Sequence, residues 1–456
     1  MDGLWKRYTE IRYFCFLCKV FGTCPISFEK KEEKITVTFK ARLYCILLGL
    51  LTLFSALYTF LVRLPESYKT VENLAKYSDA CNIFFAAAAA LTCILRSSTL
   101  KQRHIESFCI KIISVDGFLY EDDGSEYLGL ATRLVLCVVA VTIYSVVLFG
   151  HLTWLMLPTM KFSFLLPICV MQFMSNVTIL QYLFLNMALK MRFSRVNRYI
   201  LQLFFLSTRD AEGELDIKIS KLVNETPEKK DLQCDDQLFL RKTFSSLHSE
   251  AQIIVNGSRD VIHCCNQVMV TEEDAKKLKN LRKIYCLLVE IGKAVNAAYG
   301  VQNLVEVVSC FVSTVTYIYI SVVVYLDLKP VWPGIPRSQV ITMFSLWTGL
   351  MAGRLLATAY SSDMVVQETA RTQRLVQKLM LLPMPARSGC PDELQLFGEQ
   401  MARSQLRYSA AGLFTLDLSL LRSFTATVTT YVVILVQFGL SGASKQQNSS
   451  AVACRC

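Results

Sequence analysis

Long runs of apolar residues, separated by polar connections, dominate the sequence. A helix that spans a bilayer needs about 20 mostly apolar residues. Seven stretches approach this length: residues 43–62, 77–95, 134–152, 164–189, 304–326, 340–361 and 419–440. The stretch at 77–95 is the weakest, because Tyr77, Ser78, Asp79 and Asn82 precede its apolar run. The pattern predicts an all-α membrane protein with seven transmembrane helices.

The composition agrees with a membrane protein. Of the 456 residues, 53% are hydrophobic and 19% are charged, whereas soluble domains carry about 25% charged residues. The formal net charge is +11, but the basic residues fall between the apolar runs rather than in one cluster. This distribution is typical of membrane topology and gives no reason to expect nucleic acid as a partner.

The distribution of Lys and Arg predicts the orientation of the helices. These residues are frequent in the first 40 positions and in the connections 190–303 and 362–418, and sparse in the loops between them. Because cytoplasmic loops carry the excess of Lys and Arg, we expect a cytoplasmic N-terminus and an extracellular C-terminus. The expected divisions are a cytoplasmic N-terminal segment (1–42), spans 1–4 with the ligand-sensing region (43–189), a cytoplasmic connection with a mobile insert and an anchor helix (190–303), spans 5–6 (304–361), a cytoplasmic anchor segment (362–418), span seven (419–440) and an extracellular tail (441–456).

The end of the long connection carries an apolar stripe. Between residues 273 and 303, apolar side chains recur at a spacing of three to four: Leu278, Leu281, Tyr285, Leu288, Ile291, Val295 and Ala298. This spacing predicts a helix that continues into the fifth span. The stripe either packs on the chain's own neighbouring helices or joins subunits at a common base, and the pattern favours neither.

A polar stripe follows the last span. Ser423, Thr427, Thr430, Ile434, Gln437 and Ser441 succeed one another at gaps of three or four and therefore share one helix face. Lipid cannot satisfy such a face, so it must meet protein or water. Hydrogen bonding inside the core of one chain is one interpretation. The other is a conduction path built from several copies of this helix, with Ile434 as an apolar constriction next to a weakly selective ring of Gln437 amides.

The sequence TYVVILVQF at 430–438, preceded by GLFTLDLSLLRSFTATVT, resembles the C-terminal motif of insect gustatory receptors. The resemblance implies a homotetrameric ligand-gated cation channel of the plasma membrane, alone or with other gustatory receptor subunits, and no enzymatic activity. In that family, which is related to insect odorant receptors, the seventh helix lines a central pore and cytoplasmic helix extensions form the subunit anchor. By position, Thr430, Tyr431, Gln437 and Phe438 are the motif residues, and Ile434 and Gln437 are expected at the gate.

A tastant pocket is expected among the outer halves of spans two to six. Sugar recognition needs aromatic surfaces and neutral hydrogen-bonding groups. The candidate residues are Asp79, Asn82, Trp154, Gln172, Asn176, Tyr317, Tyr325, Trp347 and Thr348. Trp154 could instead anchor the membrane interface, and Gln172 and Asn176 could instead join helices. Glu306, Arg354 and Asp363 are expected to form structural ion pairs or to extend toward the cytoplasmic surface.

These residues favour a small extracellular sugar such as fructose as the ligand. Two alternatives stay open: a gustatory receptor for bitter compounds, and a seven-span G-protein-coupled receptor, which the predicted orientation opposes. No cofactor is expected. Cys15 and Cys18, and His263 with Cys264 and Cys265, have no second pair of ligands at the spacing of a zinc site.

Overall fold

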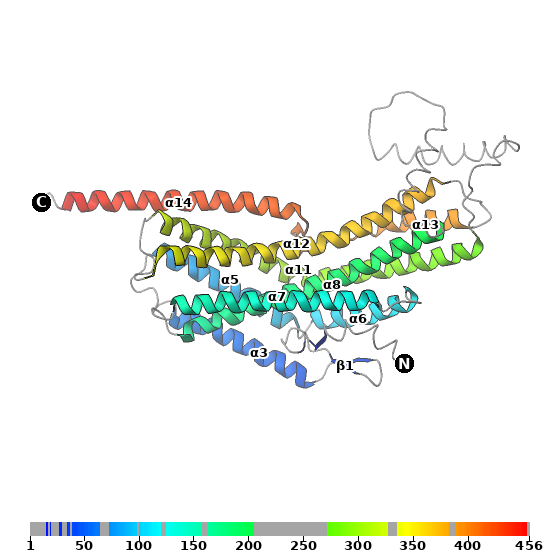
Figure 1. Cartoon of the computed structure of the whole chain (residues 1–456), viewed down its shortest axis with the longest axis horizontal. Helices are drawn as coiled ribbons and strands as arrows, with labels where there is room; N and C mark the ends of the chain where they lie inside the picture. Colours follow the sequence, from blue (N-terminus) through cyan, green and yellow to red (C-terminus); the bar gives the residue numbers. More distant parts are fainter. Residues whose placement is uncertain are drawn as a thin grey trace, which may run out of the picture. The chain divides into compact units, whose positions relative to one another are not determined.

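The structure is a computed structural model that describes residues 15, 16, 19, 27–29, 34–36, 39–63, 73–97, 100–119, 125–156, 162–204, 271–326, 335–382 and 389–453. The long helices are α3 (Phe39–Tyr58), continued by the π-helical turn η1 (Thr59–Arg63), α5 (Asn73–Ser97), α6 (Leu100–Leu119), α7 (Ser125–Met156), α8 (Phe162–Phe204), α11 (Glu272–Tyr325), α12 (Arg337–Met380), α13 (Cys390–Arg403) and α14 (Ser419–Ala453) (Figure 1). The strands of this part of the chain form two short hairpins, β1 (Ser27–Glu29) with β2 (Lys34–Thr36) and β3 (Ser409–Ala410) with β4 (Phe414–Thr415).

Six of the described helices are long and apolar enough to cross a membrane. They are α3 with η1, α7, α8, α11, α12 and α14, and they coincide with six of the seven predicted spans. The remaining predicted span, 77–95, lies inside α5, whose described apolar part is limited to Ala80–Thr92. The all-helical class and six apolar helices are thereby established, and the seventh span stays a prediction.

The chain divides into two compact units. The first contains residues 1–191, 290–367 and 406–456, and the second contains residues 192–289 and 368–405. Helices α8, α11 and α12 each contribute residues to both units. The predicted mobile insert at 207–247 and the pair Cys264 and Cys265 lie outside the described residues.

Two apolar clusters form the core of the first unit. One joins α7, α8, α11 and α12 and includes Leu152, Leu165, Tyr317 and Trp347. The other joins α3, α5 and α8 through small or flexible side chains such as Ala56, Ala87, Ala90 and Met174. Alanines at these positions have small side chains, so the helix backbones can approach closely and pack together.

Helix α6 is an element that the sequence analysis did not predict. Its charged residues lower the mean hydropathy of the segment below that of a membrane span. Its buried residues nevertheless recur at helical spacing, with Ile105, Phe108, Ile112, Val115 and Leu119 all at most 3% exposed. A periodicity of three to four within 100–119 is therefore the signal that could have revealed it.

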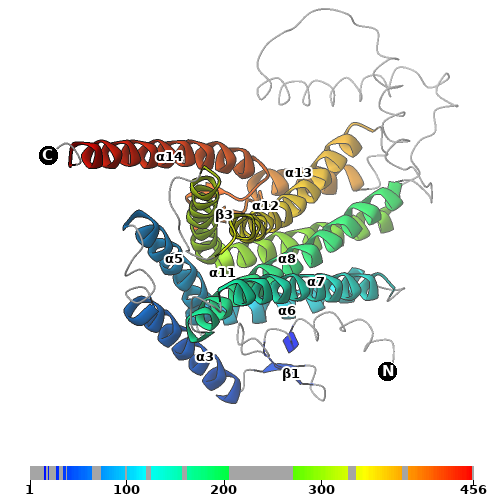
Figure 2. The same ribbon diagram turned by 60° about the vertical axis from the view of Figure 1, so that its left-hand side comes forward.

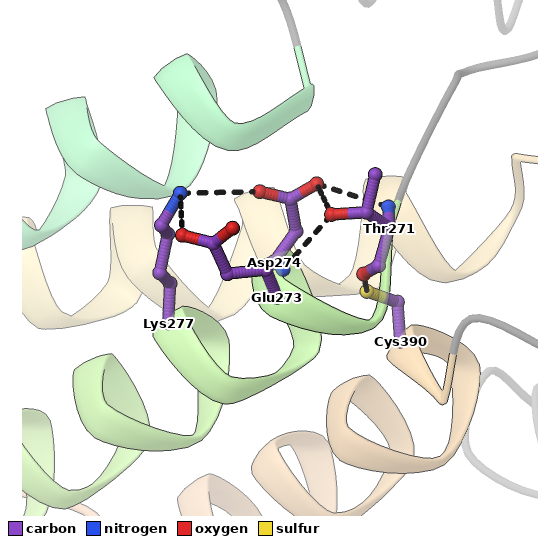
Figure 3. Close-up of polar contacts among 5 residues, drawn as sticks. All are labelled: Thr271, Glu273, Asp274, Lys277 and Cys390. Atoms are coloured by element: carbon purple, nitrogen blue, oxygen red, sulfur yellow. Dashed lines mark hydrogen bonds and ion pairs between the residues drawn. The ribbon is translucent and has the colours of Figure 1, made fainter.

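Helix α11 runs unbroken for 54 residues, as the apolar stripe predicts. All seven stripe residues from Leu278 to Ala298 are buried. Its first turn is fixed by a reciprocal cap, in which Thr271 N and Oγ1 donate to Asp274 Oδ2 over 3.0 and 2.7 Å, while Asp274 N donates to Thr271 Oγ1 over 3.3 Å (Figure 3). Lys277 pairs with Glu273 over 3.2 Å, and Cys390 Sγ reaches the Thr271 carbonyl at 3.9 Å. The two contacts made by the Thr271 and Asp274 amides pair groups that a helix start otherwise leaves without a partner.

Aromatic contacts and an ion pair join different helices of the second unit. The Tyr285 ring contacts Phe193 and Phe397 edge to face, at centroid distances of 5.6 and 5.4 Å. Arg282 Nε donates to Glu393 Oε2 over 3.1 Å, and the same arginine donates to Gln400 Oε1 over 3.2 Å. The stripe on α11 therefore has partners within its own chain at this end.

A tight hairpin precedes α14. Residues 411–413 connect the paired strands, and the Leu413 amide donates to the Ala410 carbonyl over 3.0 Å. Ala411 and Gly412 have φ values of 50° and 80°, the left-handed conformation that allows so tight a turn. The hairpin lies against α11, because a Cβ on Gly300 would come within 3.3 Å of the Ala411 nitrogen. Asn296 Oδ1 also accepts from the Ser409 amide over 3.0 Å. These contacts fix where α14 begins.

Asp417 caps the start of α14. Its Oδ1 accepts from the Ser419 amide over 2.9 Å and from the Ser419 hydroxyl over 2.5 Å. The hydrogen bond from the Ser419 side chain lowers the pKa of Asp417, so its carboxylate is charged at neutral pH. The helix that follows continues to Ala453, beyond the predicted end of the span at residue 440, and its C-terminal part projects past the other helices (Figures 1 and 2).

Candidate ligand site and pore-lining helix

The first candidate site is a buried polar contact between α5 and α11. Asn82 Nδ2 donates to the Tyr317 hydroxyl over 2.9 Å, and Asn82 Oδ1 accepts from Ser313 Oγ over 2.5 Å. All three residues are buried, and Ser313 and Tyr317 are one helical turn apart on α11. Helical periodicity thus places a hydroxyl and a phenol on the face that meets the Asn82 amide of α5.

Aromatic rings lie next to this polar contact. The Tyr317 ring has its centroid 5.5 Å from Phe344 and 6.1 Å from Trp347, both on α12. Trp347 in turn contacts Phe149 of α7 at 5.6 Å and is 4% exposed. An amide, a hydroxyl and a phenol thus adjoin an aromatic cluster, a combination that can bind neutral molecules with hydroxyl groups.

Gln172 and Asn176, one turn apart on α8, meet a buried arginine. Arg354 of α12 donates through Nε to Asn176 Oδ1 over 2.7 Å and through Nη2 to the Gln172 carbonyl oxygen over 2.6 Å. Asn176 Nδ2 donates to Ser145 Oγ of α7 over 3.2 Å. The amide of Asn176 is therefore already engaged on both sides, as in the helix-joining interpretation.

An acidic residue of α11 is also buried. Glu306 accepts a hydrogen bond from Gln302 over 3.4 Å and is 3% exposed. Gln302 also donates to the Ala89 carbonyl of α5 over 3.0 Å. Arg354 and Glu306 were expected to form structural ion pairs or to extend toward the cytoplasmic surface. Both side chains are buried, which fits a structural role and contradicts the second expectation.

The other predicted ligand residues do not join the buried cluster. Trp154 and Tyr325 are 66% and 76% exposed in the single chain. Thr348 is partly buried and donates to the Phe344 carbonyl of its own helix over 2.8 Å. Asp79 lies in α5, but its side chain is outside the described residues. The structure thus brings together Asn82, Tyr317 and Trp347, with Gln172 and Asn176 in the Arg354 network.

The polar stripe of α14 is exposed rather than internal. Five of its six side chains are exposed: Ser423, Thr427, Thr430, Ile434 and Gln437. The side chain of Ser441 is outside the described residues. Thr427 and Thr430 donate to the carbonyl oxygens of Ser423 and Ala426 on their own helix, over 2.8 and 3.0 Å. The described helices therefore do not cover this stripe.

A different face of α14 packs on the chain. Val428 is 6% exposed, and Phe424 and Tyr431 contact Phe311 of α11 edge to face at 5.9 and 5.6 Å. Leu435 and Val436 pack against the aromatic cluster of α11 and α12. The packing positions are offset by one residue from the polar stripe, which corresponds to about 100° around the helix. Phe438, the last motif residue, is 70% exposed.

Among the described residues, no three His, Cys, Asp or Glu side chains converge in a way that could hold a metal ion. The acidic and basic groups of the first unit that are buried serve helix contacts instead. The chemistry of both candidate sites is therefore that of neutral hydrogen-bonding groups and aromatic rings.

Three comparisons place these features among known proteins. Residues 11–442 match the family described as 7tm chemosensory receptor. Gustatory receptor 28b of Drosophila melanogaster is 23% identical over 188 residues, which are 40% of this chain and only 40% of that receptor. The structure of the insect olfactory receptor OR5 of Machilis hrabei superposes with a TM-score of 0.58, and its complex with eugenol with 0.57, each at 12% identity over 94% of this chain and 97% of the other.

Proposed function

The chain belongs to the 7tm chemosensory receptor family, whose insect members include gustatory and olfactory receptors, and we propose that it is a tastant-gated cation channel. It would sit in the plasma membrane as a homotetramer, alone or with related subunits. The observation that carries the proposal is the exposed polar stripe of α14. Thr427, Thr430 and Gln437 share one exposed face of α14, and a polar face that includes an amide is costly to place in lipid.

Assembly around α14 gives this stripe an environment that suits it. If four copies meet along it, the hydroxyls and amides face water, while Phe424 and Val428 keep their contacts with the rest of the chain. Ile434 is the apolar member of the stripe and would form the water-free constriction that closes the pore. A lining without Asp or Glu favours weak selectivity among cations.

The proposed ligand is a small sugar such as fructose, bound from the outer side. The cluster of Asn82, Ser313 and Tyr317 supplies donors and acceptors, and Trp347 supplies an aromatic face for the C–H groups of a sugar ring. A bitter compound is the second candidate, since the same rings bind apolar ligands. A G-protein-coupled receptor is the alternative of another class, and it requires the opposite orientation of the N-terminus.

Whole-cell recording from cells that express only this chain tests the proposal. We expect a fast cation current on application of fructose, glucose or sucrose that persists when G-protein signalling is blocked. A current that disappears with the block would indicate the G-protein-coupled alternative. A current evoked only by bitter compounds would show that the ligand is a bitter compound and not a sugar.

Recordings from the Asn82→Ala variant test whether this cluster binds the ligand. This variant removes the amide that is proposed to bind a hydroxyl group of the ligand, and a hydrogen bond of this kind contributes about 0.5–1.5 kcal/mol. The half-maximal ligand concentration is expected to rise about three- to tenfold at unchanged maximal current. Thr342→Ala is the control, because Thr342 of α12 is exposed and its hydroxyl donates only to the Ser338 carbonyl of its own helix over 2.8 Å. Equal dose–response curves for Asn82→Ala and the wild type would remove this cluster from the ligand site.

A further inference from the structure

A second buried polar cluster lies between α8, α11 and α12, and neither candidate site uses it. Its members are neutral and at most 3% exposed: Tyr182 and Asn186 of α8, Tyr299 and Asn303 of α11, Ser361 and Ser362 of α12, and Tyr408, which directly precedes β3. All of them belong to the first unit. A polar group buried among apolar helices costs free energy unless it finds a hydrogen-bond partner. The partners of these groups therefore decide what the cluster can bind.

Two adjacent serines of α12 hold the α8 side of the cluster. The Tyr182 hydroxyl lies 2.7 Å from Ser362 Oγ, and either oxygen could be the donor. Asn186 Nδ2 donates to Ser361 Oγ over 3.3 Å. Both serine hydroxyls donate to the Thr358 carbonyl oxygen, over 3.0 and 2.9 Å. Because a serine hydroxyl carries a single hydrogen, Tyr182 is then the donor to Ser362. These bonds fix the positions of the Tyr182 phenol and the Asn186 amide.

Three tyrosine rings connect this side to α11 and to the segment before α14. The centroid of the Tyr182 ring lies 5.3 Å from that of Tyr299 and 6.3 Å from that of Tyr408. Asn303 follows Tyr299 by four residues and therefore lies on the same face of α11. Tyr408 is held here through the next residue, Ser409, whose amide donates to a side chain of α11 over 3.0 Å. The cluster thus lies where the chain leaves the membrane helices and turns into the β3–β4 hairpin.

Three buried polar atoms of the cluster have no hydrogen-bond partner among the described residues. They are Asn186 Oδ1, Asn303 Nδ2 and the Tyr408 hydroxyl. The set combines an acceptor, a donor and a hydroxyl that can do both. A metal cation would require oxygen acceptors alone, and an anion would require donors alone. Water both donates and accepts, and a buried water molecule typically has about three polar partners. The chemistry of the three atoms therefore fits water.

We propose that one or more bound water molecules join α8 and α11 to the segment that leads into α14. Water donates to Asn186 Oδ1, accepts from Asn303 Nδ2 and bonds to the Tyr408 hydroxyl, so each of the three atoms gains a partner. The cluster lies at the predicted cytoplasmic ends of spans 4, 5 and 6, close to a source of water. Through this site the membrane helices hold the start of the hairpin, and with it the start of α14. The water site depends neither on the ligand nor on the conduction path.

Radiolytic footprinting of the full-length protein in lipid nanodiscs tests the site, because hydroxyl radicals formed from bound water oxidise the aromatic side chains next to it. Tyr182 and Tyr408 are the reporters. Phe193 and Phe397 are the matched controls, since both are fully buried (0% exposed) and contact another aromatic ring. Each rate is divided by the intrinsic reactivity of its residue type. We expect the two tyrosines to be oxidised several times faster than the two phenylalanines. Equal normalised rates overturn the proposal.

The Tyr408→Phe variant provides a second test, in which a hydrated and a dry site give opposite signs. It removes only the hydroxyl. In a hydrated site the bound water loses one partner, and the melting temperature is expected to fall by a few degrees. In a dry site the variant removes an unpaired buried hydroxyl, and the melting temperature rises. Tyr360→Phe is the control, because Tyr360 of α12 is 49% exposed, and it should melt with the wild type. A melting temperature of Tyr408→Phe at or above that of the wild type overturns the proposal.

Discussion

Cells that express the Ile434→Ala variant are expected to carry a steady cation current without ligand, at least about tenfold above the wild type. Ile434 is the apolar residue within the polar stripe and is 39% exposed in the single chain. Apolar constrictions close a pore by expelling water. Loss of apolar surface equal to two methylene groups removes about 1.6 kcal/mol of the free energy that favours the closed, dry state. A change of about 1.4 kcal/mol shifts the equilibrium between closed and open channels by a factor of ten.

Val432→Ala is the control for this prediction. Val432 is partly buried, and two residues correspond to about 200° around a helix, so it lies on the side of α14 opposite Ile434. It also loses apolar surface, but the loss is expected to leave the ligand-free current unchanged. Equal ligand-free currents from the two variants would mean that the stripe face has no special role in closing the channel.

The Arg354→Ala variant is expected to lose about 3 kcal/mol or more of its free energy of unfolding, because a hydrogen bond to a charged group contributes about 1.5–3 kcal/mol. The substitution removes the buried donor to Asn176 Oδ1 and to the Gln172 carbonyl. Surface expression should fall together with the melting temperature of the detergent-purified protein.

Lys111→Ala provides the comparison, since it breaks an ion pair of the same unit that is accessible to solvent. Such pairs contribute at most about 1 kcal/mol, so its melting temperature should stay close to that of the wild type. If the Arg354→Ala and Lys111→Ala proteins have the same melting temperature, the buried network contributes little to the stability of the fold.

The helices follow from the sequence wherever periodicity or length is decisive. The three-to-four spacing from Leu278 to Ala298 predicts an unbroken α11, and the apolar runs predict six of the observed helices. Helix α6 was missed because charged residues alternate with its buried face. The β3–β4 hairpin was missed because its two strands have only two residues each, too few for any alternation to be visible.

The candidate sites depend on contacts that are distant in the sequence. Asn82 and Tyr317 are separated by 235 positions, and Asn176 and Arg354 by 178. Residue type and depth suggested Asn82, Tyr317 and Trp347, but they equally suggested Trp154 and Tyr325, which lie apart from the cluster. The role of Arg354 could not be predicted, because nothing in its local sequence identifies a partner on α8. The α14 stripe is different: its spacing is local, and the structure adds that Ser423, Thr427, Thr430, Ile434 and Gln437 are exposed among the described helices.

The central claim is that the stripe face of α14 lines the path of the ions. The most direct test is the reversal potential of the ligand-evoked current in Gln437→Glu and Gln437→Lys, recorded in mixed sodium and calcium solutions. If Gln437 faces the pore, the carboxylates raise the relative permeability to calcium and the ammonium groups lower it, so the two reversal potentials move in opposite directions from the wild type. Two variants that reach the cell surface, respond to ligand and keep the wild-type reversal potential would contradict the claim, and the conduction path would then have to be sought on another helix.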